Sequence, residues 1–426
     1  MKFSYWFFIS LILGIPFTLL GQPLLTPEMA LSIVKEKSFS LTINHARVDM
    51  ATLTRQSGLG PFLPLFSASS TQAGKLSHPT FRKPELALNA NLNLFDGFSS
   101  YHAYQGLKSQ EKAAQAQEQT ELEKTLVSVL EIYFDIVKQK CRLGALYDLL
   151  FVSESRAKLA QAKMELGAGS KLEQLQSLAD LNADSSAYLA QEVSLNEAKM
   201  KLNLLMNSIP TTVFEVLDSI PLEDSLPLQQ WKDSLLFNNP SIKKIRFDYE
   251  SSKHNLKQAQ GNRLPDLDAG FSYVLNPALS SMNSTGSSGT NPNAVNYSLK
   301  LTLPLFDRLQ AHKEIGLARL QIRQSLYEIQ LLENEIQGEF EMAAQRYRTG
   351  KRQIQLEEKN LEVTRLQVEA ALERYRVGST SPLEFRDAQR KRLDAQSRLI
   401  DARYGTKSAE LTLQRLAGIL SLTAAR

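Results

Sequence analysis

The longest pattern in the chain is an apolar residue at every seventh position, and it occurs in two separate stretches. The first stretch has Leu122, Val129, Ile136, Leu143, Leu150, Ala157 and Met164, and the second has Phe340, Tyr347, Ile354, Leu361, Val368 and Tyr375. A repeat of this period, held this long, is typical of helices that supercoil along a partner helix. The stretches lie within 97–166 and 307–377, and each range predicts one helix of about 100 Å at ~1.5 Å per residue.

Shorter helical segments have the lengths needed to pair with these two long helices. They are 26–57 and 171–207 for the first long helix, and 241–262, 382–418 and 228–237 for the second. Two segments stacked end to end would match one long antiparallel partner. The pattern therefore predicts two antiparallel coiled coils. Segments 241–262 and 382–418 are together shorter than the second long helix, and 228–237 would supply most of the missing length.

Strict alternation of apolar and polar residues marks strands ahead of each long helix. Between 84 and 95, leucines alternate with Asn89, Asn91 and Asn93, and the segments 267–275 and 294–306 alternate in the same way. A first strand within 62–76 is less regular. Each predicted strand has about the 9–11 residues that a tilted membrane strand needs. Polar-inside, apolar-outside alternation suits a water-filled membrane barrel, although a half-buried sheet in water would give the same pattern.

The chain repeats itself after 211 positions. The tripeptide at 94–96 recurs at 305–307, and Gly167 with the pair 172–173 recurs as Gly378 with 383–384. Ten extra residues in the second copy fall most naturally in 276–296, which is rich in Ser, Gly and Asn. The duplication gives two strands per copy and four per chain. A closed membrane barrel has at least about eight strands, and an open edge cannot stay in lipid, so the barrel must be shared between chains.

The N-terminus predicts export from the cytoplasm. Residues 3–20 carry no charge and follow Lys2, and the small Gly21 stands where a signal peptidase could cut. A membrane anchor is the competing interpretation, but Gly14 and Pro16 interrupt the apolar run. The single cysteine, Cys141, cannot close an intramolecular disulfide and is expected to be a buried or half-buried helix residue.

Composition removes several classes of function. The formal charge of +4 is spread over 426 residues with no basic block, so nucleic acid is not an expected partner. The five histidines have no metal-binding spacing, and no phosphate-binding glycine loop or nucleophile elbow is present. We therefore expect no enzymatic activity, no cofactor and no metal site.

The order and spacing of these features resemble those of the TolC-like outer-membrane efflux proteins. The resemblance rests on the LFDG and LPLFD junctions at 94–97 and 303–307 and on the tip sequences ELGAGSKLEQLQSLADL (165–181) and RYRVGSTSPLEFRDAQRKRLDAQ (374–396). It implies a homotrimer with a 12-stranded barrel in outer-membrane lipid and a helical tunnel in the periplasm. It also implies a periplasmic adaptor and an inner-membrane transporter as partners, for which this chain would be the passive exit duct in tripartite efflux or type I secretion.

The same resemblance implies roles for residues near the tips. Glu173, Tyr375, Glu384 and Asp387 match positions of the entrance gate, and Thr380 stands where the family has an arginine that ties the gate closed. Adaptor contacts are implied for the two tips, at Leu166, Gly167, Ala168, Val377, Gly378 and Ser379. From spacing alone, Glu384 and Asp387 share a helix face, which an ordinary solvated surface would also explain.

The expected organisation follows from these observations. It comprises a signal peptide (1–21), a first repeat (22–207), a connector (208–240), a second repeat (241–418) and a tail (419–426). The fold class is mainly α with a membrane β portion. The alternative to a duct is a coiled-coil structural protein of the envelope or cell surface that transports nothing.

Overall fold

A computed structural model describes residues 23–71, 85–275, 293–377 and 379–420. The predicted signal peptide, most of the predicted loop at 276–296, and Gly378 lie outside the described residues. The helices are α1 (Pro27–Lys37), α2 (Phe39–Ser57), α3 (Ser99–Glu165), α4 (Lys171–Leu205), α5 (Leu228–Asn238), α6 (Pro240–Gly261), α7 (Gln310–Arg376) and α8 (Pro382–Leu416), with a short 3₁₀ turn at Gly60–Phe62. The strands are β1 (Leu65–Thr71), β2 (Glu85–Phe95), β3 (Asp266–Leu275) and β4 (Asn293–Thr302).

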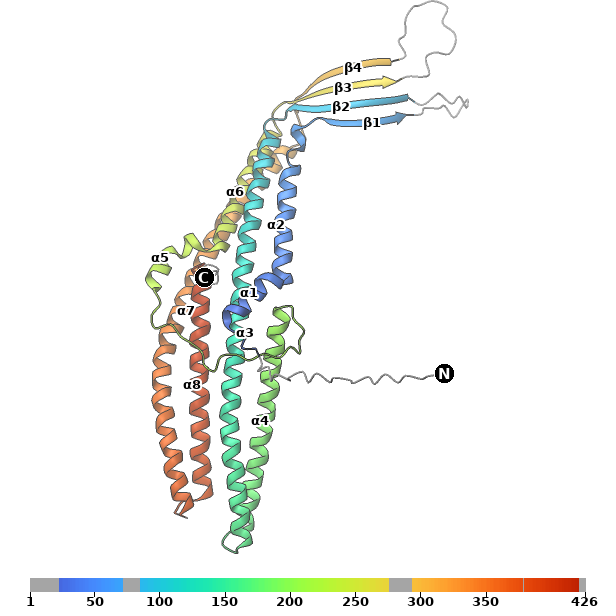
Figure 1. Ribbon diagram of the computed structural model, residues 1–426. Helices are drawn as coiled ribbons and strands as arrows, with labels where there is room; N and C mark the ends of the chain where they lie inside the picture. The colour runs from blue at the N-terminus through green and yellow to red at the C-terminus, as the bar shows by residue number, and fades with distance from the viewer. Residues whose placement is uncertain (1–22, 72–84, 276–292, 378, 421–426) are drawn as a thin grey trace, which may run out of the picture.

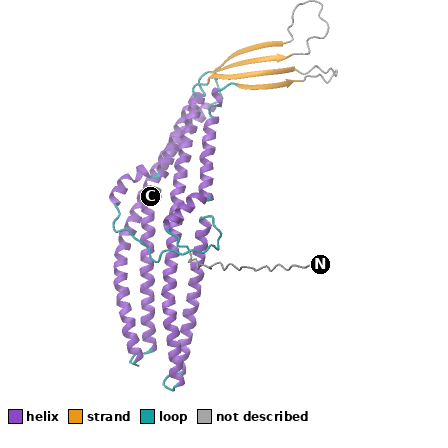
Figure 2. Cartoon of the chain, viewed as in Figure 1, coloured by secondary structure: helices purple, strands orange, loops and turns teal. Residues whose placement is uncertain are grey.

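Two 67-residue helices, α3 and α7, run the length of a tall helical layer, and the sheet projects from one end of it (Figure 1). The residues of the seven-residue repeat are buried or half-buried along both helices, and none of them is exposed. This confirms the two predicted long helices. Figure 2 shows that the rest of this layer, which we call the tower, is also helical. Its loops lie only near its middle, which we call the waist, and at its two ends.

The predicted end-to-end stacking is confirmed for the first long helix. α4 packs along one part of α3, and α1 with α2 packs along the remainder. The stack closes where the Asn207 side chain just beyond α4 donates a hydrogen bond to the carbonyl of Lys37, the last residue of α1. The segment predicted as one helix at 26–57 is two, because Ser38 has an extended backbone that turns α1 toward the core.

The second stack differs from the prediction at α5. The Asn239 side chain donates a buried 3.0 Å hydrogen bond to the carbonyl of Leu416, so the end of α8 meets the start of α6 directly. α5 therefore does not extend the stack. It stands to one side of the layer (Figure 1), where Leu235 packs on α7 and Lys232 forms an ion pair with Glu341.

The internal duplication extends to the helix caps. α3 and α7 begin 211 positions apart, and so do α4 and α8. Asp96 accepts a hydrogen bond from the Ser100 amide at the start of α3, and Asp307 accepts one from the Ala311 amide at the start of α7, at 2.7 and 2.6 Å. Each carboxylate satisfies an amide that the first turn of a helix leaves unbonded.

The largest apolar cluster lies at the waist of the tower, around the middle of α3. Tyr133 is fully buried there, and its hydroxyl donates to the Leu25 carbonyl while accepting from the Leu217 amide. The connector between the repeats wraps this region, because Leu24 and Glu215 form a parallel β-bridge. Cys141 is half-buried beside the same cluster, as expected from the sequence.

The four strands form one antiparallel sheet in the order β1-β2-β3-β4. The registers align the alternating pattern across all four strands, because Phe66, Ala90, Phe271 and Tyr297 are consecutive partners. One face is therefore apolar, and Tyr297 on it is 88% exposed in the single chain. The opposite face carries the polar row of Asn93, Asp268 and Lys300 and their neighbours. Among the described helices, none is both long and apolar enough to cross a membrane.

The junction between sheet and tower depends on close backbone contact at Gly97. This residue has φ +66°, and a Cβ placed on it would lie 2.3 Å from the carbonyl oxygen of Gly261 at the end of α6. We expect Gly97→Ala to cost about 2 kcal/mol or more, since a left-handed conformation costs ~1–2 kcal/mol for a residue with a Cβ even before the clash. The measurement is the thermal midpoint of the helical circular dichroism signal.

Gly60→Ala is the matched control, because a Cβ there meets nothing within 4 Å. Equal midpoints for the two variants would show that the junction does not require close approach at Gly97.

Candidate functional site

The tips of the tower are the two tight turns that follow α3 and α7. Gly167 has φ +73° and its neighbour Ala168 donates a 2.8 Å hydrogen bond to the Lys163 carbonyl, which closes the first turn. In the second turn, Ser379 donates to the Arg374 carbonyl at the same distance. Leu166 and Val377 are 84% and 77% exposed and occupy equivalent places in the two copies. The two apolar residues predicted as tip contacts are therefore exposed in the single chain.

Glu173 and Glu384 occupy the same place in the two copies but bond differently. Each lies in the first turn of its helix, where Ser170 caps the amide of Glu173 and Ser381 caps that of Glu384. Because helix N-termini carry partial positive charge, both carboxylates are stabilised there. Glu173 then accepts a 3.0 Å hydrogen bond from the Tyr375 hydroxyl, whereas Glu384 accepts one from the Thr380 hydroxyl.

Tyr375 thus joins α7 of the second copy to α4 of the first. Its ring stacks on Phe385 with centroids 5.5 Å apart, and the ammonium of Lys163 lies 4.9 Å from the ring centre. Burial, together with the hydrogen bond to the Glu173 carboxylate, raises the pKa of Tyr375 to about 12. The phenol therefore keeps its proton, and with it this hydrogen bond, across the physiological range.

A buried ion network lies deeper than the tyrosine and makes the same connection between copies. The Arg386 guanidinium on α8 donates to both carboxylate oxygens of Asp184 on α4, at 2.6 and 2.7 Å. Ser153 on α3 also donates to Asp184, and Arg156 on α3 pairs with Asp180. The side chains of Arg386 and Asp184 are each 7% exposed, and the hydrogen bonds to Asp184 raise the pKa of Arg386. No sequence pattern indicates this network, because Arg386 and Asp184 lie 202 positions apart.

The four residues predicted for the gate are not all brought together. Glu173 and Tyr375 are in contact, as described. Asp387 instead forms an ion pair with Lys391 one turn along α8, with both side chains 60% exposed. Glu384 and Asp387 face solvent in the single chain. Arg386, which lies between them in sequence, turns away toward Asp184.

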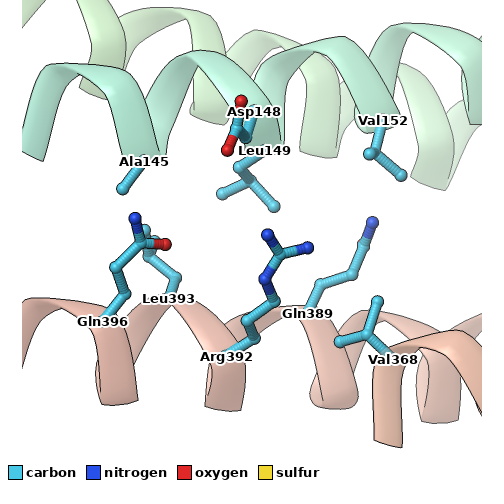
Figure 3. Close-up of a pocket in the computed structure, with 9 residues that line it drawn as sticks. All are labelled: Ala145, Asp148, Leu149, Val152, Val368, Gln389, Arg392, Leu393 and Gln396. Carbon is cyan, nitrogen blue, oxygen red and sulfur yellow. The ribbon is translucent and has the colours of Figure 1, made fainter. Parts of the chain in front are cut away.

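Two cavities lie between the copies near the tips. One of about 290 Å³ is lined by Glu173, Tyr375, Arg156, Asp180, Arg386 and Arg390. The other, of about 30 Å³, lies between α3 and α8, and Figure 3 shows Gln389 extending across it toward Val152. That volume corresponds to roughly one water molecule, so the second cavity cannot hold a transported compound. Among the described residues, no group of His, Cys, Asp or Glu could hold a metal ion.

The geometry defines a class of protein: a tall helical tower with a polar contact between its copies at one end and a two-faced sheet at the other. Comparison with known proteins agrees with this class. Residues 231–419 match the family model described as "Outer membrane efflux protein". The outer membrane efflux protein BepC of Brucella suis biovar 1 (strain 1330) is 18% identical over 406 residues, which cover 94% of this chain and 87% of BepC.

Solved structures show the same fold. The CmeC outer membrane channel of Campylobacter jejuni superposes with a TM-score of 0.81 at 17% identity, covering 92% of this chain and 85% of CmeC. The outer membrane protein VceC of Vibrio cholerae gives a TM-score of 0.80 at 17% identity, covering 92% and 96%. Over residues 231–419 the chain thus matches the outer membrane efflux protein family, and over 92% of its length it shares the fold of CmeC and VceC.

A double-mutant cycle measures the strength of the Arg386–Asp184 contact. Arg386→Met or Asp184→Leu alone should cost about 3–5 kcal/mol of unfolding free energy, because each leaves a buried charge without its partner. The double variant should cost less than the sum of the two, since neither charge then remains. Chemical denaturation followed by circular dichroism gives all three values.

The control is the exposed ion pair of Arg376 with Glu373, 2.9 Å apart. Arg376→Met should cost no more than ~1 kcal/mol, as is usual for surface pairs. Strictly additive losses at Arg386 and Asp184 would contradict direct coupling between the two residues.

Proposed function

We propose that this protein is the outer-membrane exit duct of a tripartite efflux or type I secretion system, assembled as a homotrimer. It would conduct substrates passively from a periplasmic adaptor and an inner-membrane transporter to the exterior. The observation that carries the proposal is a four-stranded sheet with an apolar face, a polar face and two edge strands, at the end of the helical tower.

The edges of the sheet favour closure between copies of the chain. In an antiparallel sheet of four strands, β1 and β4 run in opposite directions, so β4 of one copy can pair antiparallel with β1 of the next. Repetition of this contact by rotation closes a ring without a free edge, as lipid requires. Three copies give the 12 strands of the family barrel, with the apolar row of Phe66 and Tyr297 facing outward.

The helical layer also has apolar surface at two opposite edges. Leu189, Val193, Met200 and Leu204 form an exposed stripe on α4, because their spacing places them on one helix face. On α7, Leu356 and Val363 are exposed one heptad apart. α4 and α7 lie at opposite edges of the lower tower (Figure 1), so a head-to-tail ring of copies would cover both stripes.

The gate of the duct is proposed at the tips. Opening would move the ends of α7 and α8 away from those of α3 and α4, which separates Tyr375 from Glu173 and Arg386 from Asp184. Thr380 stands where family members have a gate arginine, and in this chain the Arg386 network supplies a guanidinium contact between the same helices from a different position. Glu384 and Asp387 would line the entrance. The exposed tips, including Leu166 and Val377, would meet the adaptor.

The first test measures assembly and conduction together. The mature chain in detergent should be a trimer by light scattering and should form ion-conducting pores in planar bilayers. Leu189→Lys with Val193→Lys should convert trimers to monomers and abolish conduction, because charges would replace an apolar contact. Ser194→Lys, an exposed polar position on another face of α4, should leave both readouts unchanged.

A monodisperse monomer that conducts would contradict the shared barrel. A chain that forms no pores and stays in the aqueous phase after membrane removal would support the structural envelope protein instead.

The second test measures ion selectivity at the entrance. Six carboxylates from Glu384 and Asp387 of three copies would attract cations, because a narrow low-dielectric channel focuses their field. Arg386 is paired with Asp184, so it does not neutralise this ring, whereas Lys391 partly does. We expect cation selectivity in bilayers, reduced by Glu384→Gln with Asp387→Asn and increased by Lys391→Ala.

Reversal potentials across a salt gradient provide the measurement. The control is Glu154→Gln, an exposed carboxylate on α3 paired with Lys158, which should not change the potential. A wild-type channel without cation selectivity would exclude the carboxylate ring. So would a selectivity that is the same in the wild type and in the double variant.

A further inference from the structure

Two histidines from opposite halves of the chain meet just below the sheet. His102 lies in the first turns of α3, which follows β2, and His254 lies in α6, which leads into β3. The two helices pack directly at this crossing, where a Cβ placed on Gly106 would be in ordinary van der Waals contact with the Cβ of His254, at 3.6 Å. This contact is therefore part of the joint by which the tower holds the middle strands of the sheet.

The two imidazole rings lie against each other without hydrogen bonds that would fix a proton between them. Their centroids are 5.8 Å apart and their planes differ by 30°. The Nδ1 atom of each ring is buried and has no hydrogen-bond partner among the described residues. Tyr101 places the edge of its ring against His102 at 5.3 Å. The surroundings thus suit two neutral rings.

Charges near the pair oppose protonation. Lys257 on α6 acts on both imidazoles, and Glu250 and Lys253 act on His254 with opposite signs. In the described part of the chain, no charged group of the neighbouring α2 or α7 contributes to either ring. Burial first, and then Lys257, lowers the pKa of both histidines.

We propose that the His102–His254 contact is an acid-sensitive joint, closed when both rings are neutral and loosened when they are protonated. Two imidazolium ions beside Lys257 would place three positive charges at one helix crossing. The packing of α6 on α3 would weaken, and the support of β3 with it. The proposal concerns a site far from the tips and does not depend on the gate or on the number of chains.

The sign of the pH dependence follows from the direction of the shifts. A histidine with a lowered pKa in the folded protein binds a proton more readily once the joint opens, where its pKa returns toward 6.5. The full stability of the joint is present above this value. It is lost as the pH falls through the lowered pKa values, since protons then favour the open form.

Hydrogen–deuterium exchange of the purified full chain tests the proposal. After correction for the intrinsic effect of pH on exchange, amides at 251–261 should exchange faster at pH 5.0 than at pH 7.5, by about tenfold for each pKa unit of lowering. His254→Asn should reduce this pH dependence to the share that comes from His102. His254→Lys should already show fast exchange at pH 7.5.

His312→Asn is the matched control, because this exposed histidine on α7 lies outside the pair. It should keep the wild-type dependence on pH. If His254→Asn does not fold, His102→Asn provides the same comparison. Corrected exchange that is independent of pH in the wild type, or that keeps its full pH dependence in either asparagine variant, would overturn the proposal.

Discussion

A helix of 67 residues has an apolar stripe about 100 Å long that it cannot bury by itself, and the architecture of this protein follows from that constraint. The chain meets it by stacking two shorter helices against each long one. The stacks close through side-chain amides, from Asn207 to the Lys37 carbonyl and from Asn239 to the Leu416 carbonyl. These bonds satisfy carbonyl groups that helix ends would otherwise leave without partners. The waist of the tower is therefore where both repeats, the connector and α5 come together.

The two copies keep the same scaffold but carry different chemistry at the tips. Caps, turns and helix lengths repeat with a separation of 211 residues, down to Ser170 and Ser381 at the starts of α4 and α8. The residues that bridge the copies do not repeat, because Met164 and Leu175 stand in the first copy where the second has Tyr375 and Arg386. A contact that pairs an acidic residue of one repeat with a basic or phenolic residue of the other needs such differences between equivalent positions. The contacts Tyr375–Glu173 and Arg386–Asp184, which we call the polar bridge, accordingly join acidic residues of the first copy to a tyrosine and an arginine of the second.

Sequence patterns were sufficient for the two long helices and for the strands, although they did not indicate the break at Ser38 within 26–57. The seven-residue repeat predicted α3 and α7, and strict alternation predicted the faces of the sheet, because both follow from backbone geometry. Contacts between distant segments were not accessible in this way. Asp184 and Arg386 lie far apart in the sequence, and nothing in the spacing of His102 and His254 indicates that α3 and α6 bring them together.

The failed prediction for α5 has the same origin. Segment lengths alone favoured placing 228–237 within the stack, but a single buried hydrogen bond at Asn239 decides that α8 and α6 meet directly. For the gate, the family resemblance indicated Glu173 and Tyr375, which are in contact. The roles of Glu384 and Asp387 stay predictions, because they depend on neighbouring copies of the chain.

The equal lengths of α3 and α7 restrict how this chain can change during evolution. An inserted or deleted helical turn in one long helix would shift its tip relative to the other and move Tyr375 away from Glu173. Such a change is compatible with the polar bridge only if the second copy and both stacked partners change by the same amount. Growth of the tower therefore requires concerted changes in four separate parts of one gene.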